Sequence, residues 1–255
     1  MLFLIGMGLT NKDMSLSAFD AIAKSDEILV DPYTNYITDE DLGRLKEKIS
    51  KVPTLLSRSD LEENAKLIIA KANGKNIALL VSGDPLIATT HHIILDLAHK
   101  AGVKFTVYHA ASIFSAAIGE SGLDIYKFGP TTTITFWTDN YKPVSFIDVI
   151  KKNLDNDEHT LALFHYDYLE KRKMRLGEAI PLLHTADEIR KHGIMGAERK
   201  LLILGDVGKE TQSIKYVAFG KIDKAILREF EGKLLVIIVP GKLNFAEEEA
   251  LSKFA

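Results

Sequence analysis

The chain has 255 residues, enough for one large α/β domain or two small ones, and 46% of them are hydrophobic, as in proteins with a substantial core. The net charge of -3 excludes a general attraction to nucleic acid or anionic lipid, and the absence of cysteine excludes disulfides and thiolate metal sites. The opening MLFLIGMGLT lacks the basic region of a signal peptide, and no window approaches the roughly 20 apolar residues of a membrane span. We therefore expect a soluble, cytoplasmic protein with no membrane or nucleic-acid partner.

Strand-like and helix-like segments alternate over residues 1–108. This alternation predicts right-handed βαβ units and a parallel sheet, whose ligands lie beyond the carboxyl ends of the strands. Gly6-Met7-Gly8 and Ser82-Gly83-Asp84-Pro85 follow two such ends and are candidate ligand loops. Ser59 or Asp60 is placed to cap a helix. The predicted strands are 2–6, 27–31, 51–56, 76–81 and 104–108, and the predicted helices are 15–24, 39–49, 59–72 and 88–100.

The second half has a different pattern, because two pairs of its predicted strands have no long helix between them. A mixed sheet is therefore expected. The predicted fold class is α/β with two domains: an N-terminal parallel-sheet domain, residues 1–110, and a C-terminal α/β domain with a mixed sheet, residues 111–255. The predicted strands are 131–136, 160–164, 200–204, 214–219 and 233–239, and the predicted helices are 112–118, 145–154 and 176–192, the last interrupted by Pro181.

Several short motifs carry little weight. Gly6-x-Gly8 follows a strand, but Asn11 stands where a dinucleotide fingerprint needs its third glycine. The segment GDVGK (205–209) has the wrong spacing for a phosphate loop, and no serine sits in a G-x-S-x-G nucleophile elbow. These patterns argue against nucleotide hydrolysis and against a serine hydrolase.

The eight histidines invite a metal hypothesis that their spacing does not support. His91 and His92 are adjacent, so on a helix they point about 100° apart. His165 and Asp167 share one face of a strand but have no evident third ligand. We expect surface or hydrogen-bonded histidines and no metal. The basic run Lys171–Lys173 is expected to be a solvated face, with an acidic partner surface as the alternative.

Four segments in the same order resemble the diphthine synthase family of the tetrapyrrole methylase-like superfamily. The Gly-Asp-Pro loop marks only the superfamily, whereas its flanks and SGLDIYKFG are specific to the family. The match spans nearly the whole chain. The four segments are FLIGMGLT (3–10), LLVSGDPLIATTHHI (79–93), HAASIFSAAIGESGLDIYKFG (109–129) and IVPGKL (238–243).

The resemblance implies an S-adenosyl-L-methionine-dependent methyltransferase, with S-adenosyl-L-homocysteine as its product. The acceptor would be the amino group of the 3-amino-3-carboxypropyl-histidine intermediate on translation elongation factor 2, giving diphthine in diphthamide biosynthesis. A homodimer with the cofactor folded in the inter-domain cleft is also implied. A tetrapyrrole methyltransferase of the precorrin or uroporphyrinogen type, and a non-catalytic cofactor-binding adaptor, remain alternatives.

The family's cofactor contacts carry over to eight positions of this sequence. The register of Phe164, Val207 and Leu235 is less secure than that of the others. LFHYDYLEKR is longer than the usual family segment, so Phe164 could be displaced by one or two residues. Many relatives have histidine in place of Leu235, so a side-chain contact there would be lost. The positions are Leu9, Asp84, Ile87, Ser112, Ile113, Phe164, Val207 and Leu235.

Methyl transfer from a sulfonium requires an unprotonated amine held in line with the C–S bond, about 3 Å from the methyl carbon, and no metal. We expect the backbone at Gly6, Gly8 and Gly83 to bind the cofactor. We expect Asp84 to accept one of its donors from a solvent-facing loop, and Ser112, at a helix start, to favour its carboxylate. No general base is identifiable from the sequence, and the proton of the amine is left to water.

Overall fold

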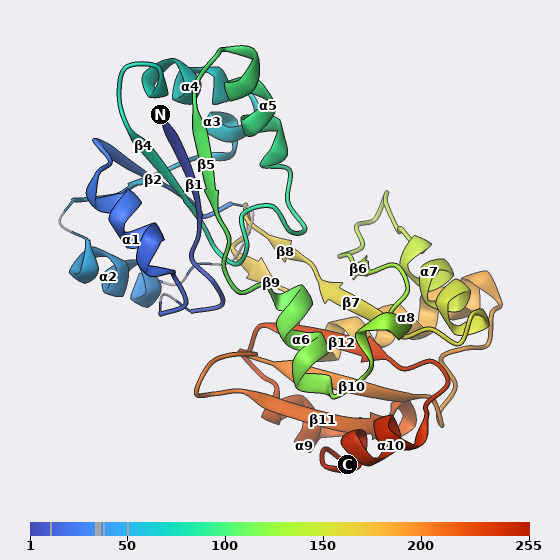
Figure 1. Cartoon of the computed structure of the whole chain (residues 1–255). Helices are drawn as coiled ribbons and strands as arrows, with labels where there is room; N and C mark the ends of the chain where they lie inside the picture. The colour runs from blue at the N-terminus through green and yellow to red at the C-terminus, as the bar shows by residue number, and fades with distance from the viewer. Residues whose placement is uncertain (11, 34–36, 38, 50) are drawn as a thin grey trace. The chain divides into compact units, whose positions relative to one another are not determined.

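The computed structural model describes the chain except for residues 11, 34–36, 38 and 50, so Asn11 lies outside the described residues. The chain divides into two compact units, which we call the N-terminal unit, Met1–Ile113, and the C-terminal unit, Phe114–Ala255. Each unit is built on its own sheet (Figure 1).

In the N-terminal unit, five strands among the described residues form a sheet in the order β3-β2-β4-β1-β5, and every neighbouring pair is parallel. The predicted parallel sheet is therefore confirmed. All its carboxyl ends lie at one edge, which we call the carboxyl edge. The elements are β1 (Leu2–Gly6), α1 (Leu16–Ala23), β2 (Glu27–Asp31), α2 (Asp39–Lys48), β3 (Thr54–Leu55), α3 (Arg58–Glu62), α4 (Ala65–Ala72), β4 (Ile77–Val81), α5 (His92–Lys100) and β5 (Phe105–Tyr108).

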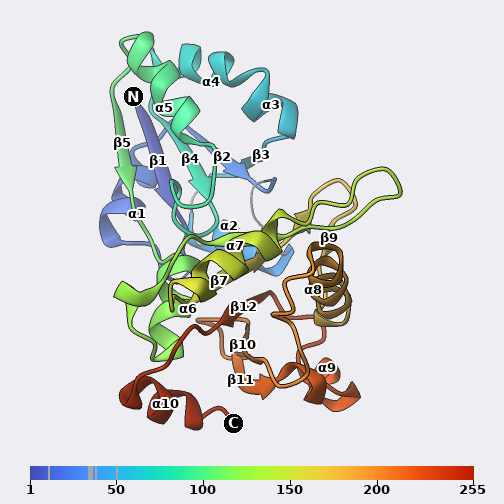
Figure 2. The ribbon, with the colours of Figure 1, turned by 90° about the vertical axis from the view of Figure 1, so that its right-hand side faces the viewer.

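Two apolar layers cover this sheet, because alternate strand residues point to opposite faces. Phe3 and Ile5 of β1 pack with α1 and α2 on one face, whereas Leu2 and Leu4 pack with α3, α4 and α5 on the other. Figures 1 and 2 show the two groups of helices on either side of the strands. Central strands buried on both faces explain the uninterrupted apolar runs in the sequence.

Two predicted helices of this unit differ most from the observed ones. The single helix predicted over 59–72 is two helices, α3 and α4. The N-cap of α3 is Ser57. Its Oγ accepts from the backbone N–H of Asp60 at 3.3 Å, and its own N–H donates to the Asp60 carboxylate at 2.8 Å. The helix predicted from residue 88 begins only at His92, because Ala88 has a φ of 54°, which no right-handed helix accommodates.

The C-terminal unit, all of whose residues are described, has a five-stranded mixed sheet in the order β11-β10-β12-β7-β6. Only the β6–β7 pair is parallel, which confirms the predicted mixed sheet. Helices α7, α8 and α9 contribute side chains to the apolar core on one face. The elements are α6 (Ile113–Ser121), β6 (Thr132–Ile134), α7 (Ser145–Asp155), β7 (Thr160–Phe164), β8 (Tyr166–Asp167), β9 (Arg172–Lys173), α8 (Leu176–Arg190), β10 (Lys200–Gly205), β11 (Ser213–Ala218), α9 (Lys224–Glu229), β12 (Leu235–Val239) and α10 (Phe245–Ser252).

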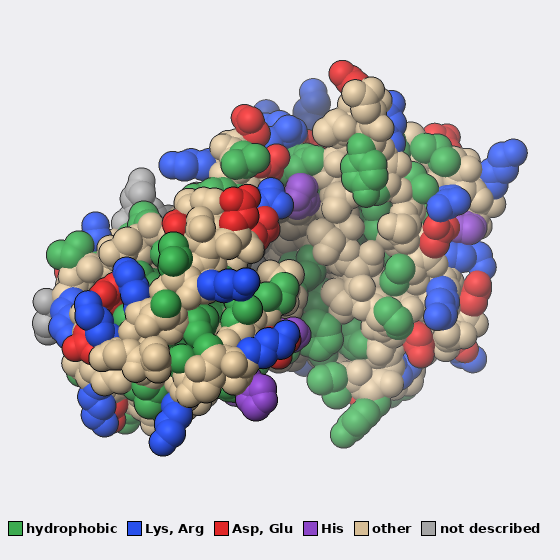
Figure 3. All heavy atoms as spheres, turned by 90° about the horizontal axis from the view of Figure 1, so that it is seen from above, with side chains coloured by type: hydrophobic (Ala, Val, Ile, Leu, Met, Phe, Trp, Pro, Cys, Tyr) green, Lys and Arg blue, Asp and Glu red, His purple; other side chains and the backbone are tan. Residues whose placement is uncertain are grey.

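The surface carries charges of both signs. Figure 3 shows acidic and basic side chains interspersed over the face that it displays, in keeping with the small net charge. Within the described residues, no helix combines the length and the apolar character that crossing a bilayer requires.

Candidate functional site

Loops that follow β1, β4 and β5 converge at the carboxyl edge of the N-terminal unit. A Cβ on Gly6 would lie 2.7 Å from the carbonyl oxygen of Gly83, 2.8 Å from Pro85 Cδ and 2.9 Å from the Cβ of Ala110. Only a residue without a side chain allows three loops to approach so closely. This convergence explains why glycine ends the first strand.

Gly8 and Gly83 join two of these loops directly. Their backbones form an antiparallel bridge, with Gly8 N–H donating to Gly83 at 3.1 Å and Gly83 N–H donating to Gly8 at 2.9 Å. Both have φ above 70°, the left-handed region that favours glycine. The expectation that these backbone groups bind the cofactor is therefore wrong for their N–H groups, which are occupied by each other.

Asp84 lies inside this loop cluster. Its side chain is only 6% exposed, so the expectation of a solvent-facing aspartate is wrong. Its Oδ1 accepts from Leu86 N–H at 2.9 Å, and its Oδ2 accepts from Ala110 N–H at 3.3 Å and lies 2.8 Å from Nδ1 of His109. A carboxylate has about four acceptor positions, so about one is left for a ligand. Asp84 therefore holds the loops of β4 and β5 together.

The other predicted contacts of this unit gather near the same edge. Leu9 follows the glycine bridge and is half-buried, whereas Ile87 is 43% exposed. Ser112 is buried immediately before α6, and Ile113 is the first residue of that helix. The edge thus combines apolar side chains with partial exposure, the surface that a purine ring or a thioether would contact.

In the C-terminal unit, the remaining predicted contacts lie at one end of the sheet. Gly205 at the end of β10 pairs with Leu235 at the start of β12, and Val207 lies two residues further on. Because Val236 pairs with Leu163, Phe164 ends β7 at the same end. The antiparallel register therefore brings together three apolar residues that are far apart in sequence. Their role as cofactor contacts stays a prediction.

Two histidine–aspartate pairs at the carboxyl edge were not predicted from the sequence. His91, 3% exposed, places Nε2 2.9 Å from the carboxylate of Asp31, the buried last residue of β2, and its Nδ1 is hydrogen-bonded to Thr89. The second pair is His109 with Asp84. The signal in the sequence was an acidic residue at or after the end of one predicted strand and a histidine that follows another predicted strand.

Histidines elsewhere also have partners within the protein. The ring of His165 packs against Phe136 with centroids 5.3 Å apart. Across the part of the chain that the structure describes, no group of three histidine, aspartate or glutamate side chains is arranged to hold a metal ion. In the basic run, Arg172 pairs with Glu178 and lies over the Phe136 ring.

The segment SGLDIYKFG (121–129) is tied to α10 by a buried polar network. Glu247 of α10, 2% exposed, accepts from Lys127, from Nε2 of His159 at 2.9 Å and from the N–H of Asp124 at 3.2 Å. Burial would raise the pKa of Glu247, but the hydrogen bonds from Lys127, the Asn244 backbone and His159 lower it to about 2. This segment therefore holds the C-terminal helix in place.

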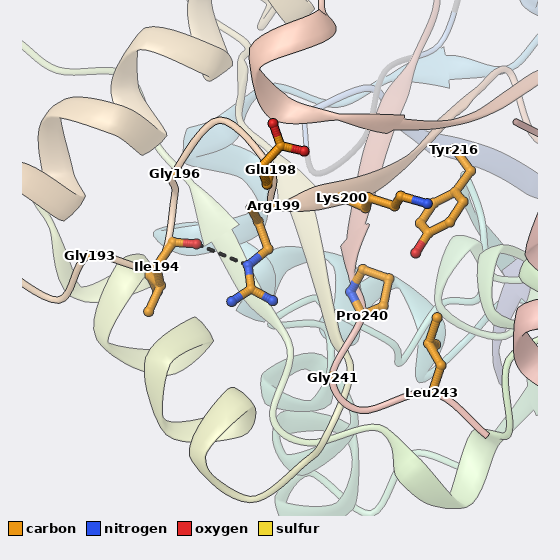
Figure 4. A pocket seen from close by; sticks show the side chains of 10 residues that line it. All are labelled: Gly193, Ile194, Gly196, Glu198, Arg199, Lys200, Tyr216, Pro240, Gly241 and Leu243. Carbon is orange, nitrogen blue, oxygen red and sulfur yellow. Dashed lines mark hydrogen bonds between the residues drawn. The ribbon is translucent and has the colours of Figure 1, made fainter.

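A hollow of about 440 Å³ opens at the other end of the C-terminal sheet from Val207 and Leu235 (Figure 4). Two of its charged side chains have contacts within the unit. Arg199 donates from Nε to the carbonyl of Ile194 at 3.0 Å, and the Lys200 ammonium lies 4.9 Å from the centre of the Tyr216 ring. None of the eight predicted cofactor contacts lines it, so the carboxyl edge remains the better candidate site.

Comparison with known proteins identifies the class. The sequence profile of the family described as Tetrapyrrole (Corrin/Porphyrin) Methylases matches residues 1–223, and the chain belongs to this family. It is therefore a methyltransferase.

Within this family the chain is similar to diphthine synthases. The enzyme of Methanocaldococcus jannaschii is 37% identical over 98% of this chain and 97% of its own length. That of Methanococcus maripaludis is 36% identical over the same shares. A crystal structure of diphthine synthase matches with a TM-score of 0.86 and 32% identity, covering 100% of this chain and 95% of that one. The resemblance drawn from the sequence motifs is confirmed.

Proposed function

We propose that this chain methylates the amino group of 3-amino-3-carboxypropyl-histidine on translation elongation factor 2, with S-adenosyl-L-methionine as donor, to give diphthine. The observation that carries the proposal is similarity to diphthine synthases over 98% of the chain, with no large part of either protein unmatched. The product would be released with S-adenosyl-L-homocysteine. A cytoplasmic location and a homodimer belong to the same proposal.

The residues at the carboxyl edge fit such a donor. Leu9 and Ile87 offer apolar surface, and Asp84 has acceptor capacity for about one more donor. Ser112 precedes a helix start, where unpaired N–H groups favour a carboxylate. In the C-terminal unit, Phe164 is half-buried, and Val207 and Leu235 are buried apolar residues at the same end of the sheet. We propose these residues, together with Ile113, as the cofactor contacts.

Bound S-adenosylmethionine supplies a methyl group on a sulfonium, whose departure leaves a neutral thioether. The protein must therefore hold the acceptor amine in line, unprotonated and shielded from competing water. Rigid loops suit this task because a small displacement of an in-line nucleophile costs much of the rate. The glycine bridge and the Asp84 hydrogen bonds fix the loops after β1, β4 and β5.

A tetrapyrrole acceptor is the second candidate, because the description of the family names corrin and porphyrin methylases. The sequence similarity favours the protein acceptor, since diphthine synthases match the chain over 98% of its length. The two candidates share the donor and differ only in what accepts the methyl group.

Isotope transfer separates them. The purified chain is incubated with methyl-labelled S-adenosylmethionine and either elongation factor 2 bearing the precursor arm or uroporphyrinogen III, after calorimetry has confirmed donor binding. We expect label on the elongation factor alone. Label on the tetrapyrrole alone would establish the second candidate, and donor binding without transfer to either would reject methyl transfer to these acceptors.

A further inference from the structure

His109 differs from the other paired histidines of the N-terminal unit. It follows β5 directly, and its side chain is 66% exposed although its partner, Asp84, is 6% exposed. Nδ1 lies 2.8 Å from Oδ2 of Asp84. Among the described residues, Nε2 has no hydrogen-bond partner, and Asp84 is the charged group facing the ring. One ring nitrogen is thus anchored, and the other belongs to a largely exposed ring and has no partner among the described residues.

The anchoring determines which nitrogen carries the proton. An ionised carboxylate only accepts hydrogen bonds, so Nδ1 must be the donor. In the neutral imidazole, Nε2 is then left with an unshared pair. Asp84 is itself fixed by the N–H groups of Leu86 and Ala110, so the ring has a defined position. A buried carboxylate orienting a histidine in this way is the usual arrangement of a general base.

We propose that His109 removes the proton from the acceptor ammonium through Nε2, with Asp84 as its positioning residue. This inference rests on the proposed function and supplies the base that the sequence does not reveal. His109 lies at the carboxyl edge, beside Ala110, whose Cβ reaches the glycine cluster. The base therefore stands where the predicted contacts Leu9, Asp84 and Ser112 gather.

The step balances without an added reagent. The Nε2 pair of His109 accepts a proton from the ammonium of the carboxypropyl arm. The freed pair on the amine nitrogen attacks the methyl carbon, so an N–C bond forms while the C–S bond breaks and its electrons remain on sulfur. Exposed Nε2 then releases its proton to water. A methylated ammonium that still bears a proton repeats the cycle.

The test is the pH dependence of single-turnover methyl transfer to elongation factor 2 by wild type and His109→Gln. At a pH well below the pKa of the acceptor ammonium, we expect the variant to be about 100-fold slower. The deficit should shrink as pH rises, because the variant uses only amine that is already neutral, a fraction that grows about tenfold per pH unit. Imidazole added to His109→Ala should restore part of the rate.

His99→Gln is the matched control, since His99 is an exposed histidine in the last turn of α5. We expect its rate to equal that of wild type. A His109→Gln rate equal to wild type at every pH, or a deficit independent of pH, would overturn the inference. Failure of the wild type to label the factor would instead reject the proposed function, so the two failures are distinguishable.

The role of Asp84 has a readout without cofactor or substrate. In protein labelled with ¹⁵N-histidine, neutral His109 should carry its proton on Nδ1. Asp84→Asn should mix the two tautomers, because an amide can donate as well as accept. If His109 kept a single tautomer in Asp84→Asn, Asp84 would not be the residue that positions it.

Discussion

Each of the two units contains a histidine paired with a buried carboxylate, and the two pairs serve different purposes. In the C-terminal unit, both ring nitrogens of His159 are occupied, with Nε2 on Glu247 and Nδ1 accepting from the N–H of Gly241 at 2.9 Å. In the N-terminal unit, His109 has one nitrogen on Asp84, and the other has no hydrogen-bond partner among the described residues. The carboxylate is buried in both pairs. The second ring nitrogen therefore decides between holding a fold and moving a proton.

Electrostatics supports the structural role of the buried pair. Burial lowers the pKa of His159, against the opposing hydrogen bond to Glu247. The ring is then neutral near pH 7, which matches one nitrogen donating and the other accepting. His91 resembles His159, because both its nitrogens have partners and its ring is buried. Of these three pairs, His109 alone has an exposed ring.

The largest effect is expected from Glu247→Ala. Removing this carboxylate leaves the Lys127 ammonium and the Nε2–H of His159 without their buried acceptor. We expect the free energy of unfolding to fall by about 3 kcal/mol, measured by chemical denaturation. Exposed Glu249→Ala on the same helix is the control, expected within about 0.5 kcal/mol of wild type. Equal stabilities for the two variants would contradict a structural role for the pair.

The stability that Glu247 supplies should depend on pH. The pKa of Glu247 is lowered from 4.5 to about 2 by folding, so the stability that it supplies is complete above pH 4.5 and is lost as pH falls toward 2. The contribution is up to about 3 kcal/mol. The lowered pKa of His159 acts in the same direction, from its ordinary value of 6.5 downward. The difference in unfolding free energy between wild type and Glu247→Gln should therefore narrow as pH falls from 4.5 to about 2. A constant difference would show that the carboxylate does not titrate in that range.

His91→Ala should destabilise the N-terminal unit by about 2 kcal/mol. The substitution removes a buried partner of Asp31, and a buried carboxylate that loses a hydrogen bond retains its desolvation cost. His92→Ala is the neighbouring control, because that side chain is exposed. Urea denaturation compares the stabilities of the two variants. A His91→Ala midpoint as high as that of His92→Ala would show that His91 does not stabilise the fold.

The smallest stability effect is expected from His109→Gln. An exposed ring paired with a carboxylate contributes little, so unfolding should change by no more than about 0.5 kcal/mol even though methyl transfer falls sharply. Thermal denaturation is the measurement. A loss as large as that of His91→Ala would mean that the two pairs in the N-terminal unit serve the same purpose.

Much of the fold is predictable from the sequence because its strands are strongly apolar. Strands 2–6, 27–31 and 160–164 have the predicted limits, and the change from a parallel to a mixed sheet follows from where helices are missing. The errors lie where tertiary contacts override local preference. Ser57 caps α3 because Asp60, three residues later, completes a capping box. Ala88 adopts a left-handed conformation, so α5 begins later than predicted.

The site was less predictable, since its chemistry depends on contacts between loops that are distant in sequence. The Gly-Asp-Pro loop indicated a ligand site, but neither the bridge between Gly8 and Gly83 nor the burial of Asp84 can be derived from one segment. His109 is 25 residues from Asp84, and only the parallel sheet brings the ends of β4 and β5 together. The pair became visible once the strand order was known.

Mass spectrometry of the target histidine on elongation factor 2 tests the central claim most directly. After incubation with wild-type protein and S-adenosylmethionine, we expect the carboxypropyl arm to gain methyl groups in successive steps and to end as the trimethylammonium form. Each step requires the amine to lose a proton, so His109→Gln should stall at earlier forms when the pH is low. An unmodified arm, with donor binding confirmed, would contradict the account.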